Sequence, residues 1–167
     1  MLTAAAVAIS EQIGCPFARR RQCPLHELTE DPARVGNTVV VGNPGIQLYI
    51  GDVVVGYHPN MARPRIRTLM RGGPDRLVGT GALRCGDSFL DCTCGLGADA
   101  AVASYVVGRR GRVCAIEQSR VLAALVNYGM QTYQHETRAL QLALRCVEVV
   151  AANAGEVLQS QPDDAWD

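Results

Sequence analysis

The sequence predicts an α/β protein: a partial parallel sheet preceded by a small α+β unit. Three observations support this fold class. From residue 88 onward, short apolar runs alternate with helix-forming segments, the order typical of parallel strands joined by helices. A glycine-rich turn follows the first run, and an acidic residue ends each of the first two. Of the 167 residues, 48% are apolar, so the chain can bury a core.

The first 57 residues are predicted to form the small N-terminal α+β unit. A helix over 1–14 is expected to end at Gly14, because the Cys-Pro pair that follows cannot continue it. A polar, arginine-rich connection occupies 17–36. Glycine- and proline-containing turns then separate three short apolar runs, which predict strands at 38–41, 46–50 and 53–55.

Residues 58–87 are predicted to be a basic helical linker, with short helices over 66–70 and 75–82. Residues 57–76 contain five arginines against one acid, Asp75. Such a patch fits contacts with RNA phosphates, and it fits equally a solvated surface or pairing with C-terminal residues beyond this sequence. The arginines are Arg63, Arg65, Arg67, Arg71 and Arg76.

Residues 88–167 are predicted to be the cofactor-binding half of a Rossmann-like domain. Strands are expected at 88–93, 112–117 and 146–151, and helices at 98–107, 119–131 and 136–144. This succession predicts a parallel sheet in the order third, second, first. The first strand would then be a bare apolar edge, so we expect a fragment, a truncated reading frame, or a chain completed by another segment or by self-association.

The turn after the first of these strands carries the chemistry. Asp91 ends the strand, Gly95 and Gly97 form a Gly-x-Gly turn, and Glu117 ends the next strand twenty residues after Gly97. In sheets of this kind a nucleotide-type cofactor lies over the turn, with its ribose on the second carboxylate. The glycine spacing also matches the dinucleotide fingerprint, so an NAD(P)-binding oxidoreductase half-domain is an alternative.

Charge favours a different cofactor. Asp99 is expected in the first turn of the following helix, and Asp91 adds a second anion nearby. Two carboxylates would repel a pyrophosphate, whereas S-adenosylmethionine carries a sulfonium and an ammonium and no phosphate. The sequence therefore favours S-adenosylmethionine.

The same segment, Asp91-Cys-Thr-Cys-Gly-Leu-Gly-Ala-Asp-Ala100, resembles class I S-adenosylmethionine-dependent methyltransferases. The likeness extends to Ile116-Glu-Gln118 and to 121–125, and it is greatest to the RsmJ/YhiQ type, which methylates guanine N2 of 16S ribosomal RNA. His58-Pro-Asn-Met-Ala62 also resembles a stretch preceding this domain in related bacterial proteins. The resemblance covers roughly 57–167 and implies a methyltransferase with an RNA substrate.

The resemblance also implies a cofactor site. The acids and glycines of the turn would hold the methionine end, Glu117 and Gln118 the ribose, and Asn153 would lie near the adenine. Ala98 and Gln118 each replace an arginine of the family pattern. The catalytic Asp-Pro loop of the family follows a fourth strand that this sequence does not reach, so catalytic residues stay unassigned and catalysis by this chain alone is not expected. The implied cofactor-binding residues are Asp91, Gly95, Gly97, Ala98, Asp99, Glu117, Gln118 and Asn153.

Each of these residues also has a structural interpretation. Asp91 could cap the next helix, Asp99 could only balance the helix dipole, and Glu117 could be a solvated acid at a strand end. Asn153 could be an ordinary turn residue. A third hypothesis is therefore a non-catalytic remnant or interaction module.

Composition narrows the partners and the compartment. The 16 basic residues, all arginine, balance 16 acids, so no global field attracts nucleic acid and an RNA partner would have to use the local patch. Seven scattered cysteines without a C-x-x-C pair predict reduced thiols, no metal site and a cytoplasmic protein. No apolar stretch reaches about 18 residues, so no membrane partner is expected.

Overall fold

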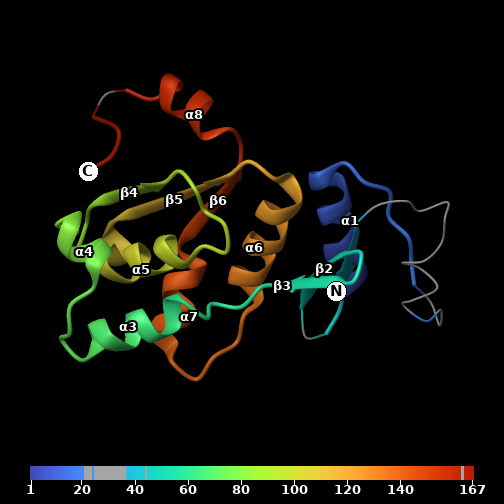
Figure 1. Ribbon diagram of the computed structural model, residues 1–167, viewed down its shortest axis with the longest axis horizontal. Coiled ribbons are helices and arrows are strands. Elements are labelled where there is room, and N and C mark those ends of the chain that lie inside the picture. The colour runs from blue at the N-terminus through green and yellow to red at the C-terminus, as the bar shows by residue number, and fades with distance from the viewer. Residues whose placement is uncertain (21–23, 25–36, 44, 163) are drawn as a thin grey trace. The chain divides into compact units, whose positions relative to one another are not determined.

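A computed structural model describes residues 1–20, 24, 37–43, 45–162 and 164–167 (Figure 1). The chain divides into two compact units, Met1–Tyr57 and His58–Asp167. Most of the arginine-rich connection predicted over 17–36, and one residue of the turn before the second strand, lie outside the described residues. The second unit contains both the segment predicted as a basic linker and all the expected site residues.

The first unit combines helix α1 (Leu2–Ile13) with an antiparallel sheet of β1 (Thr38–Val41), β2 (Ile46–Ile50) and β3 (Val53–Gly56). The predicted elements are confirmed to within a residue or two at each end. Helix α1 ends because Gly14 adopts φ 72°, a left-handed conformation that costs glycine little. The central strand β2 buries the alternate residues Ile46 and Leu48, as expected when one face of a sheet is covered.

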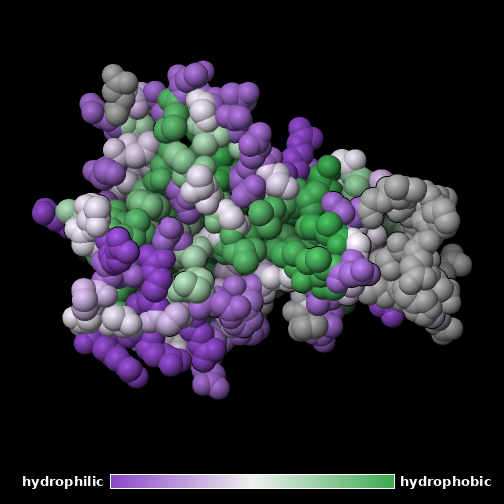
Figure 2. Space-filling view, in the orientation of Figure 1, coloured by the Kyte–Doolittle hydropathy of each residue, from purple (hydrophilic) through white to green (hydrophobic). Residues whose placement is uncertain are grey.

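The first unit also exposes apolar surface. Figure 2 shows apolar side chains gathered over α1, β2 and β3. The exposed members of this surface include Leu2, Ile50, Val53 and Val54.

The second unit is built on a parallel sheet of β4 (Ser88–Asp91), β5 (Arg112–Glu117) and β6 (Val147–Ala151). The order β4-β5-β6 confirms the predicted order, and both pairings are parallel. Four consecutive residues of β5, 113–116, are buried, as expected for a strand between two others. The strand predicted over 88–93 ends at Asp91, because the backbone N–H of Thr93 turns back to donate to the Asp91 carboxylate.

Helices cover the sheet in layers (Figure 1). Helix α5 (Ala98–Val107) packs on β4 and β5, and α6 (Arg120–Thr132) packs on β5 and β6. An outer layer of α3 (Ala62–Met70) and α7 (Arg138–Arg145) packs on α5. Three short helices complete the unit: α4 (Arg76–Thr80), the 3-10 turn η2 (Gly108–Arg110) and α8 (Ala154–Ser160).

Several boundaries differ from the sequence prediction. Helix α3 begins at Ala62 rather than at residue 66, since Pro64 falls in its first turn, where proline is tolerated. Helix α8 and η2 were not predicted. On α6, Leu125, Val126 and Met130 of the predicted apolar face are fully buried, whereas its first two members are half-buried.

The prediction that β4 forms a bare edge is partly wrong. The backbone N–H of Asp167 donates to the carbonyl oxygen of Ser88 (3.1 Å), and the Asp167 side chain accepts from the Ser88 N–H and hydroxyl, both at 2.8 Å. The Arg112 guanidinium lies 4.6 Å from the ring centre of Trp166 and holds the same tail. The C-terminal residues therefore cover the start of this edge. Among the described residues, no helix has both the length and the apolarity needed to cross a bilayer.

Candidate functional site

The glycine turn lies where the strands of the parallel sheet end. The carboxyl ends of parallel strands meet at one edge of a sheet, so Asp91 at the end of β4 and Glu117 at the end of β5 belong to the same edge. Residues 92–97 connect β4 to α5 across this edge. The backbone N–H of Cys94 donates to the carbonyl oxygen of Ile116 (2.9 Å), which ties the turn to β5.

Gly97 is required for packing as well as for conformation. It caps the N-terminus of α5 with φ 72°, and a Cβ there would lie 2.1 Å from Cε of Met130. Gly95 also has a positive φ, 52°, but an added Cβ would meet only a backbone oxygen at 3.8 Å. The space above Gly95 is therefore open, and a ligand can approach the backbone there.

Asp91 is a buried carboxylate, 8% exposed. It accepts a hydrogen bond from the N–H of Thr93 (2.9 Å). Burial raises the pKa of Asp91, and the nearby charge of Asp99 raises it too, whereas backbone N–H groups of Thr93 and Ala100 act in the opposite direction. Because Ala100 belongs to the first turn of α5, the Asp91 carboxylate also serves the start of that helix.

Glu117 links the glycine turn to the start of the segment that follows β5. Its Oε2 accepts from the N–H of Gly95 (3.1 Å), and its Oε1 accepts from the N–H of Ser119 (2.9 Å). A carboxylate offers about four acceptor positions, so about two remain for hydroxyl donors of a ligand. Glu117 is half-buried and therefore reachable.

Asp99 is not an isolated acid. It is 57% exposed in the first turn of α5 and pairs with Nη1 of Arg65, which comes from α3. The same guanidinium donates through Nε and Nη2 to Asp75, at 2.8 and 3.0 Å. The hydrogen bond with Asp75, and more weakly that with Asp99, raise the pKa of Arg65, so one permanent cation links two carboxylates.

The remaining expected residues have different surroundings. Ala98 is half-buried as the first residue of α5, and Gln118 is exposed beside Glu117. Asn153 caps α8: its Oδ1 accepts from the N–H groups of Gly155 (2.9 Å) and Glu156 (3.3 Å). This use of the oxygen leaves the amide nitrogen of Asn153 as the group that could contact an adenine.

Four backbone N–H groups of the turn are not available to a phosphate. Phosphate-binding glycine loops point unpaired backbone N–H groups at the ligand. Here the N–H groups of Thr93, Cys94, Gly95 and Gly97 all donate within the protein.

Cys94 of the turn is not a reactive thiol. Burial, together with the charges of Asp91 and Glu117, raises the pKa of Cys94 to about 12, so this thiol stays protonated at neutral pH.

No cluster of three or more His, Cys, Asp or Glu side chains that could hold a metal ion occurs among the described residues.

The sequence prediction missed Arg65 as part of this region. In the sequence it is only one of five arginines in a basic patch. No local pattern around Arg65 indicates that it would reach Asp99, because the two residues are 34 positions apart in the chain. The cap at Asn153 could have been found, because Asn153 and Glu156 have the spacing of a capping box.

Comparisons with known proteins relate this chain to a methyltransferase fold. No protein-family model matches it. The sequence is 31% identical over 160 residues to the uncharacterized protein YpiP of Bacillus subtilis (strain 168), covering 95% of this chain and 62% of YpiP. The structure is similar to the crystal structure of a SAM-dependent methyltransferase from Neisseria gonorrhoeae, with a TM-score of 0.56 and 17% identity, covering 92% of this chain and 61% of that one. This chain thus shares its fold with that protein and spans less than two thirds of the length of either relative.

Proposed function

We propose that this chain is the cofactor-binding part of a class I S-adenosylmethionine-dependent methyltransferase of the RsmJ/YhiQ type. Bound S-adenosylmethionine would supply the methyl group. The protein would contribute binding and orientation, because methyl transfer depends mainly on holding the acceptor in line with the methyl.

The acidic turn carries the proposal. Three carboxylates, those of Asp91, Asp99 and Glu117, lie at or beside the carboxyl edge of the sheet, with Arg65 balancing one charge. The backbone N–H groups of Thr93, Cys94, Gly95 and Gly97 already donate within the protein, so a pyrophosphate could not use them without breaking those bonds. This arrangement fits a cationic nucleoside cofactor better than a dinucleotide, and it disfavours the alternative of an NAD(P)-binding half-domain.

The residues present fit the parts of that cofactor. Glu117 has acceptor positions left for the two ribose hydroxyls, and Gln118 lies beside it. The open space above Gly95 admits the cofactor to the turn, with Ala98 and Asp99 following at the start of α5. Leu96, 44% exposed, offers an apolar contact next to Gly95. Asn153 would face the adenine through its amide nitrogen.

The acceptor in this proposal is an RNA base, with guanine N2 of ribosomal RNA as the specific form. The support is the arginine-rich helix α3, over which hydrophilic side chains gather in Figure 2. The fold shared with the Neisseria methyltransferase is compatible with this acceptor and does not select it.

Calorimetric titration tests the cofactor assignment. S-adenosylhomocysteine, the product form, is expected to bind saturably to the chain, and NAD is not. Glu117→Ala should weaken S-adenosylhomocysteine binding at least about tenfold, because two hydroxyl hydrogen bonds to a charged acceptor are lost. Glu117→Gln keeps one acceptor oxygen, so its affinity for S-adenosylhomocysteine should lie between those of Glu117→Ala and the unaltered chain.

Glu148→Ala is the matched control. Glu148 is a 59% exposed carboxylate in β6 that pairs with Arg112 away from the carboxyl edge, so its removal should leave the affinity unchanged. Saturable binding of NAD without binding of S-adenosylhomocysteine would reject the proposal. Equal losses in Glu117→Ala and Glu148→Ala would remove Glu117 from the site.

A further inference from the structure

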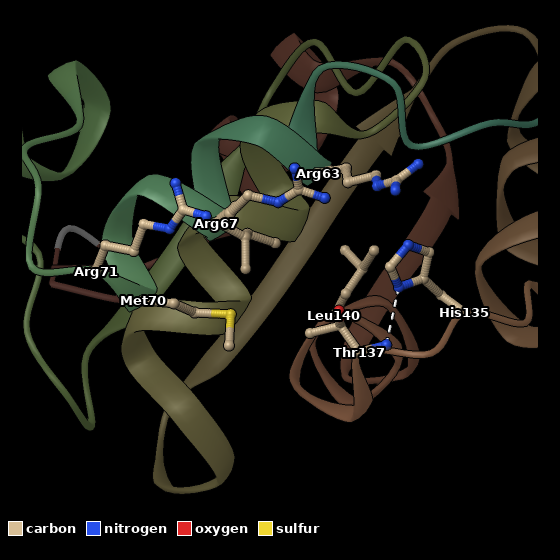
Figure 3. Close-up of a pocket in the computed structure, with 8 residues that line it drawn as sticks. Arg63, Arg67, Met70, Arg71, His135, Thr137 and Leu140 are labelled. Carbon is tan, nitrogen blue, oxygen red and sulfur yellow. Dashed lines mark hydrogen bonds between the residues drawn. The ribbon is translucent and has the colours of Figure 1, made fainter.

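A cavity lies in the outer helical layer of the second unit. It has a volume of about 310 Å³ and opens between α3 and the segment that leads into α7 (Figure 3). Arg63, Arg67 and Arg71 line one wall, His135 and Thr137 line the other, and Leu140 contributes an apolar surface. None of these residues belongs to the proposed cofactor site.

Arg63 and Arg67 lie on one face of α3, and Arg71 follows them as the C-cap of the helix. A spacing of four residues places successive side chains about 6 Å apart along a helix. All three are exposed, and no ion pair within 4.0 Å joins any of them to an acid in the described part of the chain, including the nearby Glu136. Arg65, on another face of the same helix, has two carboxylate partners.

Helix electrostatics do not account for this row. The macrodipole favours cations in the last turn of a helix, which suits Arg67 and Arg71. Arg63 lies in the first turn, where a cation is disfavoured, and no acid occupies that turn. Like charges four residues apart also repel one another. The repulsion within the row and the position of Arg63 in the first turn are costs to stability, and an anion bound in the cavity would relieve both.

The opposite wall carries stacked rings. Nδ1 of His135 accepts from the N–H of Thr137 (2.9 Å, dashed in Figure 3), which fixes the imidazole at the cavity. Tyr133 stacks on His135 with ring centres 6.2 Å apart and planes within 14°. Tyr133 also meets His58 edge to face at 5.4 Å. The imidazole of His135, supported by the ring of Tyr133 and lying beside apolar side chains, is a surface on which a nucleobase can stack.

We propose that this cavity binds one nucleotide unit of a single-stranded RNA. The arginine row holds the phosphates, and His135, backed by Tyr133, stacks an unpaired base. The combination of a basic row with a ring platform is the one that single-strand-binding sites use. The choice of RNA as ligand rests on the acceptor in the proposed function, whereas phosphate binding by the cavity stands independently of it.

The test measures anisotropy of a fluorescein-labelled single-stranded RNA of about 10 nucleotides with the whole chain and without cofactor. Arg67→Gln/Arg71→Gln should weaken binding about thirtyfold or more at low salt, because two charge-assisted phosphate contacts are lost. The slope of log K against log salt should fall in magnitude by about 0.7 for each contact. His135→Ala should weaken binding about tenfold with the salt slope unchanged.

Arg109→Gln/Arg110→Gln is the matched control, since both residues are exposed on η2 and the net charge changes equally. This control should bind RNA within about twofold of the unaltered chain. Absence of RNA binding, or equal losses in the two double variants, would overturn the proposal. If Arg67→Gln/Arg71→Gln unfolds at a lower temperature than the unaltered chain, the test uses Arg63→Gln instead. That variant should lose RNA affinity by about fivefold or more.

Two competitors separate the sources of the phosphate. A nucleoside monophosphate and inorganic phosphate should displace the RNA only at far higher concentration, because each engages fewer of the arginines. A monophosphate that binds as tightly as the RNA would identify a free nucleotide as the ligand and overturn the assignment to RNA. These titrations contain no cofactor, so failure of S-adenosylhomocysteine binding is a separate outcome that bears on the proposed function alone.

Discussion

The charged side chains around the glycine turn have partners within the protein, whereas the arginines that line the cavity beside α3 have no ion-pair partner in the described part of the chain. In the turn, the carboxylates of Asp91, Asp99 and Glu117 each have a partner within the protein. In the cavity, the arginines of the α3 row have no ion-pair partner among the residues that the structure describes. Paired charges maintain the local structure, whereas unpaired ones of like sign oppose folding. A bound anion therefore accounts for the row of arginines in the cavity better than folding does.

Helix α3 contains both cases. Arg65 turns toward α4 and α5 and links them through Asp75 and Asp99. Arg67 is only two residues further along the helix and lines the cavity. The same residue type thus has a structural role on one face of the helix and a proposed binding role on another. Variants of the two regions should separate these roles.

The largest effect is expected from Gly97→Ala. The new Cβ would clash with Met130, which is fully buried and has little room to move, and the positive φ adds strain. We expect the free energy of unfolding, measured by urea denaturation, to fall by about 2–3 kcal/mol. Gly95→Ala is the control and should cost only about 1 kcal/mol, because its Cβ meets open space. Equal losses at the two glycines would show that packing on Met130 is not the reason for Gly97.

The next effect is expected from Arg65→Met. It would leave Asp75, whose side chain is 7% exposed, without its guanidinium partner, at a cost of about 2 kcal/mol. Arg67→Met on the same helix should stay within about 0.5 kcal/mol. If Arg67→Met were as costly as Arg65→Met, the contrast between the two faces of α3 would be wrong.

The Arg65 effect should depend on pH. The hydrogen bond from Arg65 is the largest factor that lowers the pKa of Asp75, so the folded state holds the charged carboxylate more strongly than the unfolded state does. The stabilisation is therefore present at neutral pH and is lost as the pH falls through the lowered pKa. The gap between the Arg65→Met variant and the unaltered chain should close on acidification, as followed by thermal melts across the acidic range.

Asp91→Asn should have a smaller effect of the opposite sign. Burial raises the pKa of Asp91, so folding disfavours its charged form above the ordinary carboxyl pKa. Replacing it by the uncharged amide should raise the free energy of unfolding at pH 7 by about 0.5 kcal/mol. This gain should vanish at low pH, where Asp91 is protonated in both states. A loss of stability at pH 7 would mean that the hydrogen bonds of the carboxylate outweigh its desolvation.

The smallest effect on stability is expected from Arg67→Gln/Arg71→Gln. Removing two like charges four residues apart relieves their repulsion but also removes two cations that suit the end of the helix, so the free energy of unfolding should change by no more than about 0.5 kcal/mol. A loss above about 1 kcal/mol in urea denaturation would show that the row has structural partners and would weaken its assignment to a ligand.

Local signals explain which elements could be predicted. Strand β5 and helix α5 agree with prediction at both ends, because a charged residue or a glycine marks each boundary and the apolar pattern between them is unbroken. Helix α8 was missed because its residues carry little apolar pattern, although the cap at Asn153 marks its start. The glycine turn was found at the sequence level because Gly-x-Gly between a strand and a helix requires a conformation that few other residues adopt.

The order of the parallel sheet could be predicted from the sequence because strands and helices alternate along the chain. The turn at its carboxyl edge and the acids that flank it could be predicted because they follow directly on the ends of the strands. The role of each charge, by contrast, depends on contacts between distant parts of the chain. Arg65 meets Asp99 across 34 residues, and the cavity joins residues 63–71 to residues 135–140. Partners so far apart in sequence are brought together by the packing of α3 and α7 on α5, a consequence of which apolar faces are buried rather than of any local pattern.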